Sequence, residues 1–215
     1  VVNSQSSFAI LYVGMLNCSV CILGIHHMLA NTVTQNQSRQ ALDQFDEIWL
    51  FGYGSLIYKV DFPYLEKFPG YINGWQRRFW QGSHDHRGTP EKPGRVVTLI
   101  SQQDARCDGM VYRVTAEEFI HLDHREKNGY LRYEVPVILI NDSGHETEKL
   151  GIIYIADEEN SAYLGEDSEE AIAAHIASSR GPSGENSEYL ILLEEALAQL
   201  GVVDEHVSKV RSYLP

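Results

Sequence analysis

The sequence predicts an α+β domain built around a small β-barrel or curled sheet, with helices beside it. Strand-like segments occupy most of residues 48–114 and return at 133–156, whereas helical periodicity and capping residues dominate after residue 167. A front half rich in strands and a back half rich in helices are typical of this class. The length of 215 residues and the hydrophobic content of 43% fit one domain with a sizeable core, with or without an extension.

The predicted strands are apolar runs bounded by turn residues. They are expected, in chain order, at residues 48–57, 70–82, 95–101, 109–114, 133–140 and 150–156. The first strand is unusual because it contains the sequence Gly-Tyr-Gly-Ser at residues 52–55. Glycine weakens a strand and often marks a bulge or a close approach of another group to the backbone.

Capping residues and periodicity predict four helices. They are expected over residues 116–127, 169–179, 187–200 and 204–213. Thr115 and Glu118 have the spacing of a capping box at the start of the first helix. Asp167 or Ser168 is placed to cap the second helix, and Gly201 is placed to end the amphipathic third one.

The glycine stretch does not match the common nucleotide-binding motifs. A dinucleotide fingerprint requires a third glycine where Ile57 stands, and no helical pattern follows. A P-loop requires a Gly-Lys-Ser/Thr sequence, which is also absent here. Two interpretations remain: a simple bulge, or a loop whose bare N–H groups hold a carboxylate or a developing oxyanion.

The net charge of −13 argues against a nucleic-acid partner, because nucleic acids bind basic surfaces. The charge is unevenly distributed along the chain. Residues 59–95 contain seven Lys and Arg against four Asp and Glu, whereas residues 141–215 contain four against sixteen. The basic stretch suits a small anionic ligand, although an ordinary solvated surface explains it equally well.

Residues 1–45 are expected to form an apolar leader and a polar linker outside a domain that spans residues 46–215. Residues 8–25 form an apolar run without any charged residue, and the length of this run is at the lower limit for a membrane span. No basic stretch of the kind that begins a signal peptide precedes it. A membrane is therefore a partner only if this leader is a true anchor. The polar residues 31–40 are interpreted as the linker, so deletion of residues 1–45 is expected to leave the domain folded and active.

Three cysteines are too few to indicate a disulfide framework, so a reducing compartment, the cytoplasm, is the default location. Cys18 and Cys21 have the spacing of a redox motif but lack its strand–helix context. Four histidines, His84, His86, His121 and His124, are spaced in two pairs without a clear further ligand set. The sequence therefore predicts no metal site.

Four sequence blocks together resemble the ChaC-like family, the glutathione-specific γ-glutamylcyclotransferases. They are FGYGSL, RRFWQGSHDHRGTPEKPGRVVTLI, LDHREKNGY and GPSGENSEYL, and they occur at residues 51–56, 77–100, 122–130 and 181–190. The resemblance runs from about residue 48 to the C-terminus. It implies a γ-glutamylcyclotransferase-like small β-barrel with flanking helices. It also implies cleavage of glutathione to 5-oxoproline and cysteinylglycine without a metal or organic cofactor.

The resemblance also implies site residues. The catalytic glutamate of the family falls on Glu126, and its substrate loop falls on residues 52–57. Tyr53 and Tyr189 are candidate hydroxyl donors, with core packing as the alternative. Arg77, Arg78, Arg87 and Arg95 are candidates to meet the glycyl carboxylate of the substrate, and Arg78 is chosen among them. The expected substrate-binding residues are Gly52, Tyr53, Gly54, Ser55, Leu56, Ile57, Arg78 and Tyr189.

The implied reaction needs a base but no enzyme nucleophile. The α-amine of glutathione is already tethered to the γ-carbonyl that it attacks, so the enzyme has to remove a proton from the ammonium and stabilise an oxyanion. One carboxylate that acts first as base and then as acid is sufficient. Glu134 and Glu188 are the alternatives to Glu126, which by composition alone would be an ordinary surface glutamate.

Two other functions stay open on the sequence alone. One is a non-catalytic module that binds γ-glutamyl compounds or other small anions on the same barrel. The other is a cyclotransferase for γ-glutamyl amino acids or γ-glutamylamines. The presence of Glu126 within its full motif favours an enzyme, and the blocks at residues 77–83 and 181–190 favour glutathione as its substrate.

Overall fold

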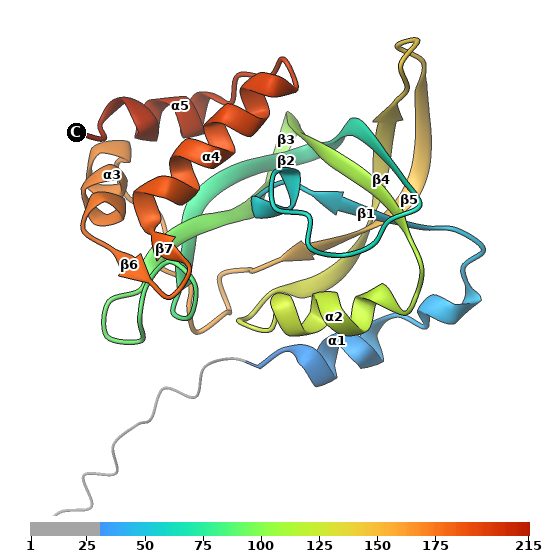
Figure 1. The fold of residues 1–215 in the computed structure, drawn as a ribbon, viewed down its shortest axis with the longest axis horizontal. Coiled ribbons are helices and arrows are strands. Elements are labelled where there is room, and N and C mark those ends of the chain that lie inside the picture. The colour runs from blue at the N-terminus through green and yellow to red at the C-terminus, as the bar shows by residue number, and fades with distance from the viewer. Residues whose placement is uncertain (1–30) are drawn as a thin grey trace, which may run out of the picture.

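The computed structural model describes residues 31–215, and within them five strands close into a barrel in the order β1-β3-β2-β4-β5 (Figure 1). The strands are β1 (Ile48–Gly52), β2 (Glu66–Ser83), β3 (Gly94–Val114), β4 (Leu131–Ile140) and β5 (Glu146–Ile155). Neighbouring strands are antiparallel except β1 and β5, whose parallel pairing closes the barrel. The apolar run at residues 8–25 and the Cys18–Cys21 pair lie outside the described residues.

Five helices of the described residues flank the barrel (Figure 1). They are α1 (Val33–Arg39), α2 (Glu118–Arg125), α3 (Glu169–Ala177), α4 (Asn186–Gln199) and α5 (Glu205–Ser212). Helices α3, α4 and α5 gather on one side of the barrel, whereas α1 and α2 lie together along another side. The predicted α+β fold, a small barrel with flanking helices, is therefore confirmed.

The observed strands differ from the predicted ones at polar residues. The two strands expected at 95–101 and 109–114 are one strand, β3, because β2 pairs with it up to Ser101 and again from Arg106, on both sides of an exposed polar segment. A register shift between Asn73 and Trp75 accommodates extra residues of β3, among them Asp104 with φ +61°. The strand expected at 48–57 ends at Gly52, and a 3₁₀ turn, η2 (Ser55–Ile57), follows it.

The predicted helix caps are partly confirmed. The Ser168 hydroxyl accepts a hydrogen bond from the Ala171 N–H (3.2 Å) at the start of α3, and Asp204 caps α5 in the same way. The capping box predicted for α2 is not formed, because Glu117 occupies the cap position and makes no side-chain bond there. Gly201 follows α4 with φ +73°, a left-handed conformation that glycine adopts without strain.

Two hydrophobic clusters divide between the two faces of the strands. One joins the barrel to helices α3, α4 and α5, and the other joins it to α2. Phe51 belongs to the first cluster and Leu50 to the second, because successive side chains of a strand point to opposite faces. The first cluster also contains Tyr189 of α4, which brings the start of that helix to the end of β1.

The linker interpretation of residues 31–40 was wrong. Residues 33–39 form α1, and Asn36 is fully buried against the body of the domain. Polar side chains in this stretch bind backbone groups of residues 126–132 instead of water, which a reading based on polarity alone does not reveal. The wider expectation for residues 1–30 lies outside the described residues.

No helix in residues 31–215 is long and apolar enough to cross a membrane.

Candidate active site

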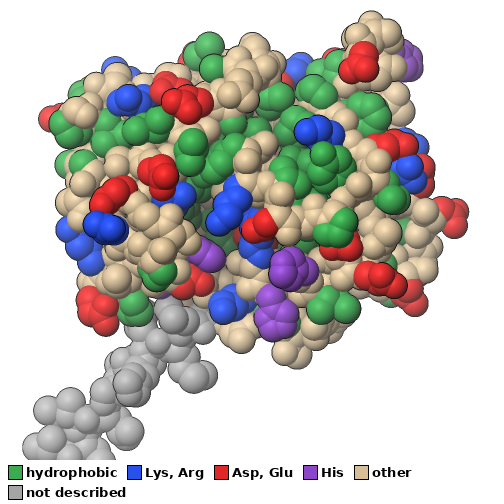
Figure 2. Space-filling view, viewed as in Figure 1, with side chains coloured by type: hydrophobic (Ala, Val, Ile, Leu, Met, Phe, Trp, Pro, Cys, Tyr) green, Lys and Arg blue, Asp and Glu red, His purple; other side chains and the backbone are tan. Residues whose placement is uncertain are grey.

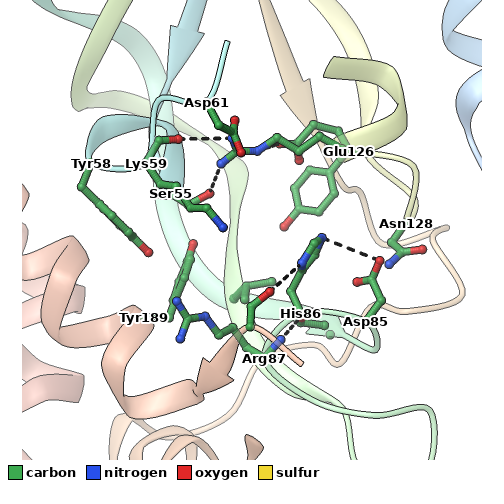
Figure 3. Close-up of a pocket in the computed structure, with 16 residues that line it drawn as sticks. Ser55, Tyr58, Lys59, Asp61, Asp85, His86, Arg87, Glu126, Asn128 and Tyr189 are labelled. Atoms are coloured by element: carbon green, nitrogen blue, oxygen red, sulfur yellow. Dashed lines mark hydrogen bonds and ion pairs between the residues drawn. The ribbon is translucent and has the colours of Figure 1, made fainter. Parts of the chain in front are cut away.

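A cleft opens where the loop after β1, the end of α2, the loop after β2 and the start of α4 meet (Figure 3). Ser55, Asp61 and Glu126 lie on one side of it, and Arg87 and His86 lie across from them. A second, inner pocket continues from the cleft toward the loop backbone. Four residues line both parts: Ser55, Glu126, Tyr130 and Tyr189.

Both glycines of the loop lie in close contact with other parts of the protein. A β-carbon at Gly52 would lie 2.6 Å from the β-carbon of Leu56, because the 3₁₀ turn folds back over the end of β1. A β-carbon at Gly54 would lie 3.1 Å from the Tyr189 hydroxyl. The glycines therefore let the loop pack tightly between β1 and α4, with Gly54 on the wall of the inner pocket.

Buried polar groups hold the glycine loop in place through hydrogen bonds at Tyr53. The Arg77 side chain is fully buried and donates from Nε to the Tyr53 carbonyl (2.6 Å) and from Nη1 to Asp204 (2.5 Å). The Tyr53 hydroxyl donates to the carbonyl of Tyr154 at 2.8 Å. These bonds fix the loop before any ligand arrives, which is the preorganisation that an anion-binding backbone needs.

The first residues of the turn η2 line the inner pocket. The N–H of Ile57 donates to the Gly54 carbonyl (3.0 Å), and that of Lys59 donates to the Ser55 carbonyl (2.7 Å). The first N–H groups of a helical turn have no acceptor within that turn, so they remain available to another group. In this loop the residues at that position are Gly54, Ser55 and Leu56, and all three line the inner pocket.

Glu126 directly follows α2, and its side chain is only 16% exposed. Burial raises the pKa of the Glu126 carboxyl above its ordinary value, and the nearby Asp61 and Asp85 carboxylates add to this effect. The Arg125 guanidinium opposes it, with Nε 3.4 Å from Oε1 of Glu126. A carboxylate with a raised pKa is a better proton acceptor than an exposed one, so this environment suits a general base.

Arg125 ties Glu126 to the glycine loop. It donates to the Ser55 hydroxyl (3.0 Å) and to the Lys59 carbonyl (3.2 Å), and it forms an ion pair with Asp61. This role of Arg125 was not predicted from the sequence, although Arg125 directly precedes Glu126 in the HREKNGY block. The position next to Glu126 is the one sign of this role in the sequence. The groups that Arg125 binds are more than sixty residues away from it in the chain.

Three tyrosines form the rest of the pocket wall. The Tyr130 hydroxyl donates to the Val97 carbonyl (2.8 Å), and the Val97 N–H donates to the Tyr189 hydroxyl at 3.4 Å. The ring of Tyr58 meets that of Tyr189 edge-on, with centroids 6.4 Å apart. Burial raises the pKa of Tyr58 to about 12 and that of Tyr189 above its ordinary value, so both hydroxyls stay protonated near neutral pH. Tyr130 was not identified from the sequence.

The choice of Arg78 is corrected by the structure. Arg78 does not line the cleft but a separate groove beside α5, together with its neighbours Gln76 and Arg77 on β2. Arg77 and Arg95 are buried and bonded to main-chain carbonyls. Of the four candidate arginines only Arg87 reaches the cleft, where its Nη1 lies 2.5 Å from Oε2 of Glu188.

The other positively chargeable groups of the cleft are Lys59 and His86. His86 Nδ1 lies 3.1 Å from the Ser183 hydroxyl, which joins the loop after β2 to the stretch before α4. Figure 2 shows basic side chains near the middle of this face of the molecule, with histidine and acidic side chains beside them. Arg87 and His86 thus form a cationic wall opposite the glycine loop, whereas Lys59 follows the loop on its own side of the cleft.

The remaining expected residues lie as follows. Gly52 and Ile57 pack within the loop and line neither pocket, whereas Tyr53 and Leu56 line the inner one. Glu134, an alternative base, is exposed on β4 and does not line the cleft. Glu188 is held by Arg87. Within residues 31–215 no group of three or more His, Cys, Asp or Glu side chains is arranged to hold a metal ion.

Comparisons with known proteins agree on one family. The model of the family described as ChaC-like protein matches residues 48–214. Gamma-glutamylcyclotransferase 2-3 of Arabidopsis thaliana is 46% identical over 170 residues, which cover 75% of this chain and 85% of the relative. The glutathione-specific gamma-glutamylcyclotransferase of Saccharomyces cerevisiae is 36% identical, with 78% of this chain and 92% of the relative covered. A crystal structure of the yeast cyclotransferase specific to glutathione superposes with a TM-score of 0.69 at 34% identity, covering 78% of this chain and 97% of that one.

Proposed function

The chain belongs to the ChaC-like family, and from this premise we propose that it cleaves glutathione to 5-oxoproline and cysteinylglycine, with Glu126 as the general base. One observation carries the proposal: a largely buried carboxylate shares an inner pocket with the start of a backbone turn. The first supplies a proton acceptor and the second supplies N–H donors, and the cyclisation of a γ-glutamyl group requires both.

The reaction is an internal transfer of the γ-glutamyl acyl group. Glu126 takes a proton from the α-ammonium of the substrate, and the free amine attacks the γ-carbonyl carbon. The new C–N bond closes a five-membered ring while the bond to the cysteinyl nitrogen breaks. Glu126 then returns that proton to the leaving nitrogen. The second proton, which the attacking nitrogen sheds on ring closure, passes to the same leaving nitrogen, so the products are a lactam N–H and the ammonium of cysteinylglycine. No water, metal or second substrate enters this balance.

The enzyme gains its rate from three sources in this mechanism. The nucleophile is tethered, so holding it in an attacking geometry can supply up to ~7–11 kcal/mol. Proton transfer by one carboxylate typically contributes ~10²–10⁴-fold. Each N–H donor to the developing oxyanion contributes about 3–4 kcal/mol. The main-chain N–H groups of Gly54, Ser55 and Leu56 are the proposed donors, and the Tyr189 hydroxyl is a further proposed contact with the γ-glutamyl group.

The cationic wall of the cleft is the proposed place for the glycyl carboxylate. Arg87 and His86 lie there, on the outer part of the site, while Glu126 extends into the inner pocket. An extended tripeptide with its γ-glutamyl end beside Glu126 would point its other end toward this wall. Arg87 therefore replaces Arg78 as the proposed partner of that carboxylate.

A direct test uses the purified full chain with three substrates: glutathione, γ-glutamylalanine and γ-glutamyl-ε-lysine. The expected result is 5-oxoproline from glutathione alone. Product from the other two compounds at a comparable rate would indicate a general γ-glutamyl cyclotransferase. Binding of glutathione without any product would indicate the binding module and would refute the enzymatic proposal.

A cytoplasmic location is part of the same proposal. Cys107 is a free, buried cysteine, and a chain with few cysteines suits a reducing compartment. Fractionation of cells that express the full chain provides the check. Recovery of the protein with membranes, rather than with the cytosol, would contradict this location.

A further inference from the structure

We propose that residues 31–39 hold the turn at residues 126–130 in its working position, and that Thr32 and Asn36 are positioning residues for Glu126. The inference rests on the proposed function for the role of Glu126 as the base. It concerns a part of the chain that precedes the region matched by the family model, residues 48–214. Neither Thr32 nor Asn36 lines the cleft, so both would act through the turn.

The turn needs external support because of its place in the chain. It begins where α2 ends, and the last carbonyl groups of a helix have no partner within that helix. It carries a cleft residue at each end, Glu126 and Tyr130. Between them Gly129 has φ +90°, and within the turn the Tyr130 N–H bonds to the Glu126 carbonyl at 3.3 Å. A single long bond leaves the turn dependent on its neighbours.

Thr32 supplies much of that support. Its N–H donates to the Lys127 carbonyl at 3.0 Å. Its hydroxyl lies 3.0 Å from the carbonyl oxygen of Tyr130, 3.1 Å from that of Lys127 and 3.4 Å from that of Glu126. The hydroxyl has one proton to share among these three acceptors, and Thr32 is only 4% exposed, so water has little access to them.

Asn36 fixes the far end of the same turn. Its side-chain amide donates to the Tyr130 carbonyl (2.9 Å), and its side-chain oxygen accepts from the Arg132 N–H (2.9 Å). Asn36 is fully buried, and the Arg132 guanidinium donates to its main-chain carbonyl. Arg39 completes the attachment of α1 by donating to the Arg132 carbonyl at 2.7 Å.

These contacts bear on catalysis because they hold the backbone that runs from the Glu126 carbonyl to Tyr130. The carbonyl groups that Thr32 and Asn36 bind belong to the residues that set the direction of the Glu126 and Tyr130 side chains. A displacement of about 1 Å at a reacting group can cost ~10²-fold in rate. Loosening the turn should therefore lower turnover before it unfolds the domain.

The test compares three variants of the full chain. Thr32→Val replaces the hydroxyl with a methyl group, and Thr32→Ser retains the hydroxyl. Leu42→Ala is the matched control, because Leu42 is 8% exposed in the cluster beneath α2 and is not among the contacts of the turn. Each variant is assayed with glutathione well below its own Tm. Backbone hydrogen exchange at residues 126–130 is measured in parallel.

Thr32→Val is expected to lower kcat at least about tenfold, a fraction of the full cost of misplacement, with little change in KM. The acid limb of its pH–rate profile should move to lower pH, because water reaching a loosened Glu126 would lessen the effect of burial on its pKa. Exchange at the turn should be faster. Thr32→Ser should have a kcat within about threefold of the wild-type value. Leu42→Ala should have a lower Tm than the wild type, with the wild-type kcat and the wild-type acid limb of the pH–rate profile.

Two results would overturn the inference. One is a Thr32→Val protein with the wild-type kcat and the wild-type exchange at the turn. The other is a loss of activity that follows Tm equally in Thr32→Val and Leu42→Ala, since that would show a general stabilising role. If the wild type itself forms no 5-oxoproline, the proposed function fails, and the exchange measurement still decides whether Thr32 holds the turn.

Discussion

Replacement of Glu126 by glutamine is the most informative single change in this protein. Glutamine keeps the size of the side chain and an oxygen that can accept from Arg125, whose Nε lies 3.4 Å from Oε1 of Glu126. It cannot take a proton from the substrate ammonium. Turnover should fall by at least ~10²-fold, the lower end for a general base, which corresponds to about 2.7 kcal/mol of transition-state stabilisation. Glutathione binding, measured by calorimetry, should change little.

The pH dependence gives a second test of Glu126. Since burial raises the pKa of this carboxyl, the rate of the wild type should rise with pH on a limb above the ordinary glutamate value of about 4.3. The Glu126→Gln protein should lack this limb, and its residual rate should follow the fraction of free substrate amine. Retention of most of the turnover with an unchanged limb would show that another group is the base.

Stability should change in the opposite direction to activity. An acid whose pKa is raised by folding binds more protons in the folded state, so the folded state loses stability as pH rises from the unfolded pKa through the folded one. Glutamine resembles the protonated form and does not carry this penalty. The Tm of Glu126→Gln at pH 7 should therefore equal or exceed that of the wild type, and any difference should shrink near pH 4. Glu134→Gln, at an exposed position, is the control for both Tm and rate.

Three further predictions concern the substrate and the N-terminal segment. Arg87→Met should raise KM for glutathione about tenfold or more, since a charge-assisted bond contributes ~1.5–3 kcal/mol, whereas Arg78→Met in the separate groove should leave KM unchanged; equal effects would contradict the assignment. Reduced glutathione should be turned over and its disulfide form should react poorly, because a small-domain cleft has limited room for a second tripeptide; comparable rates in a cysteinylglycine assay would refute this. The chain lacking residues 1–40 should turn over glutathione at least about tenfold more slowly than the chain lacking residues 1–30, because it loses Thr32 and Asn36. This prediction differs from the expectation that deletion of residues 1–45 leaves the domain active. Equal rates of the two truncated chains would show that Thr32 and Asn36 are not important for turnover.

The barrel was predictable because its strands and helices are encoded locally. Apolar runs located β4 and β5, and the Ser168 cap and Gly201 located α3 and the end of α4. Local patterns failed where burial depends on distant partners. The polar middle of β3 does not look like a strand, and the strand continues past it because β2 pairs with the residues on both sides.

The site was predictable to the extent that it consists of short motifs. The glycine loop and Glu126 belong to such motifs, and they lie side by side at the cleft. Arg78 was chosen over Arg87 because a sequence does not show that the loop after β2, rather than the strand itself, borders the cleft. Tyr130 and Arg125 were missed because their partners, Val97 and Ser55, are distant in the chain.

The raised pKa of Glu126 and the support of its turn have one structural origin. A base at the end of a helix would ordinarily be solvated, and its pKa would then be too low for efficient proton transfer near neutral pH. Here the turn is covered by α1 on one side and by the tyrosines of the pocket on the other. Burial raises the pKa of Glu126 only while its carboxylate stays in the pocket. The positive charge of Arg125 lowers the same pKa and so favours the ionised carboxylate. The segment before β1 and the arginine beside the base thus act on the same quantity in opposite directions, so removal of Thr32 and removal of the Arg125 charge should shift the pH limb of the enzyme in opposite senses.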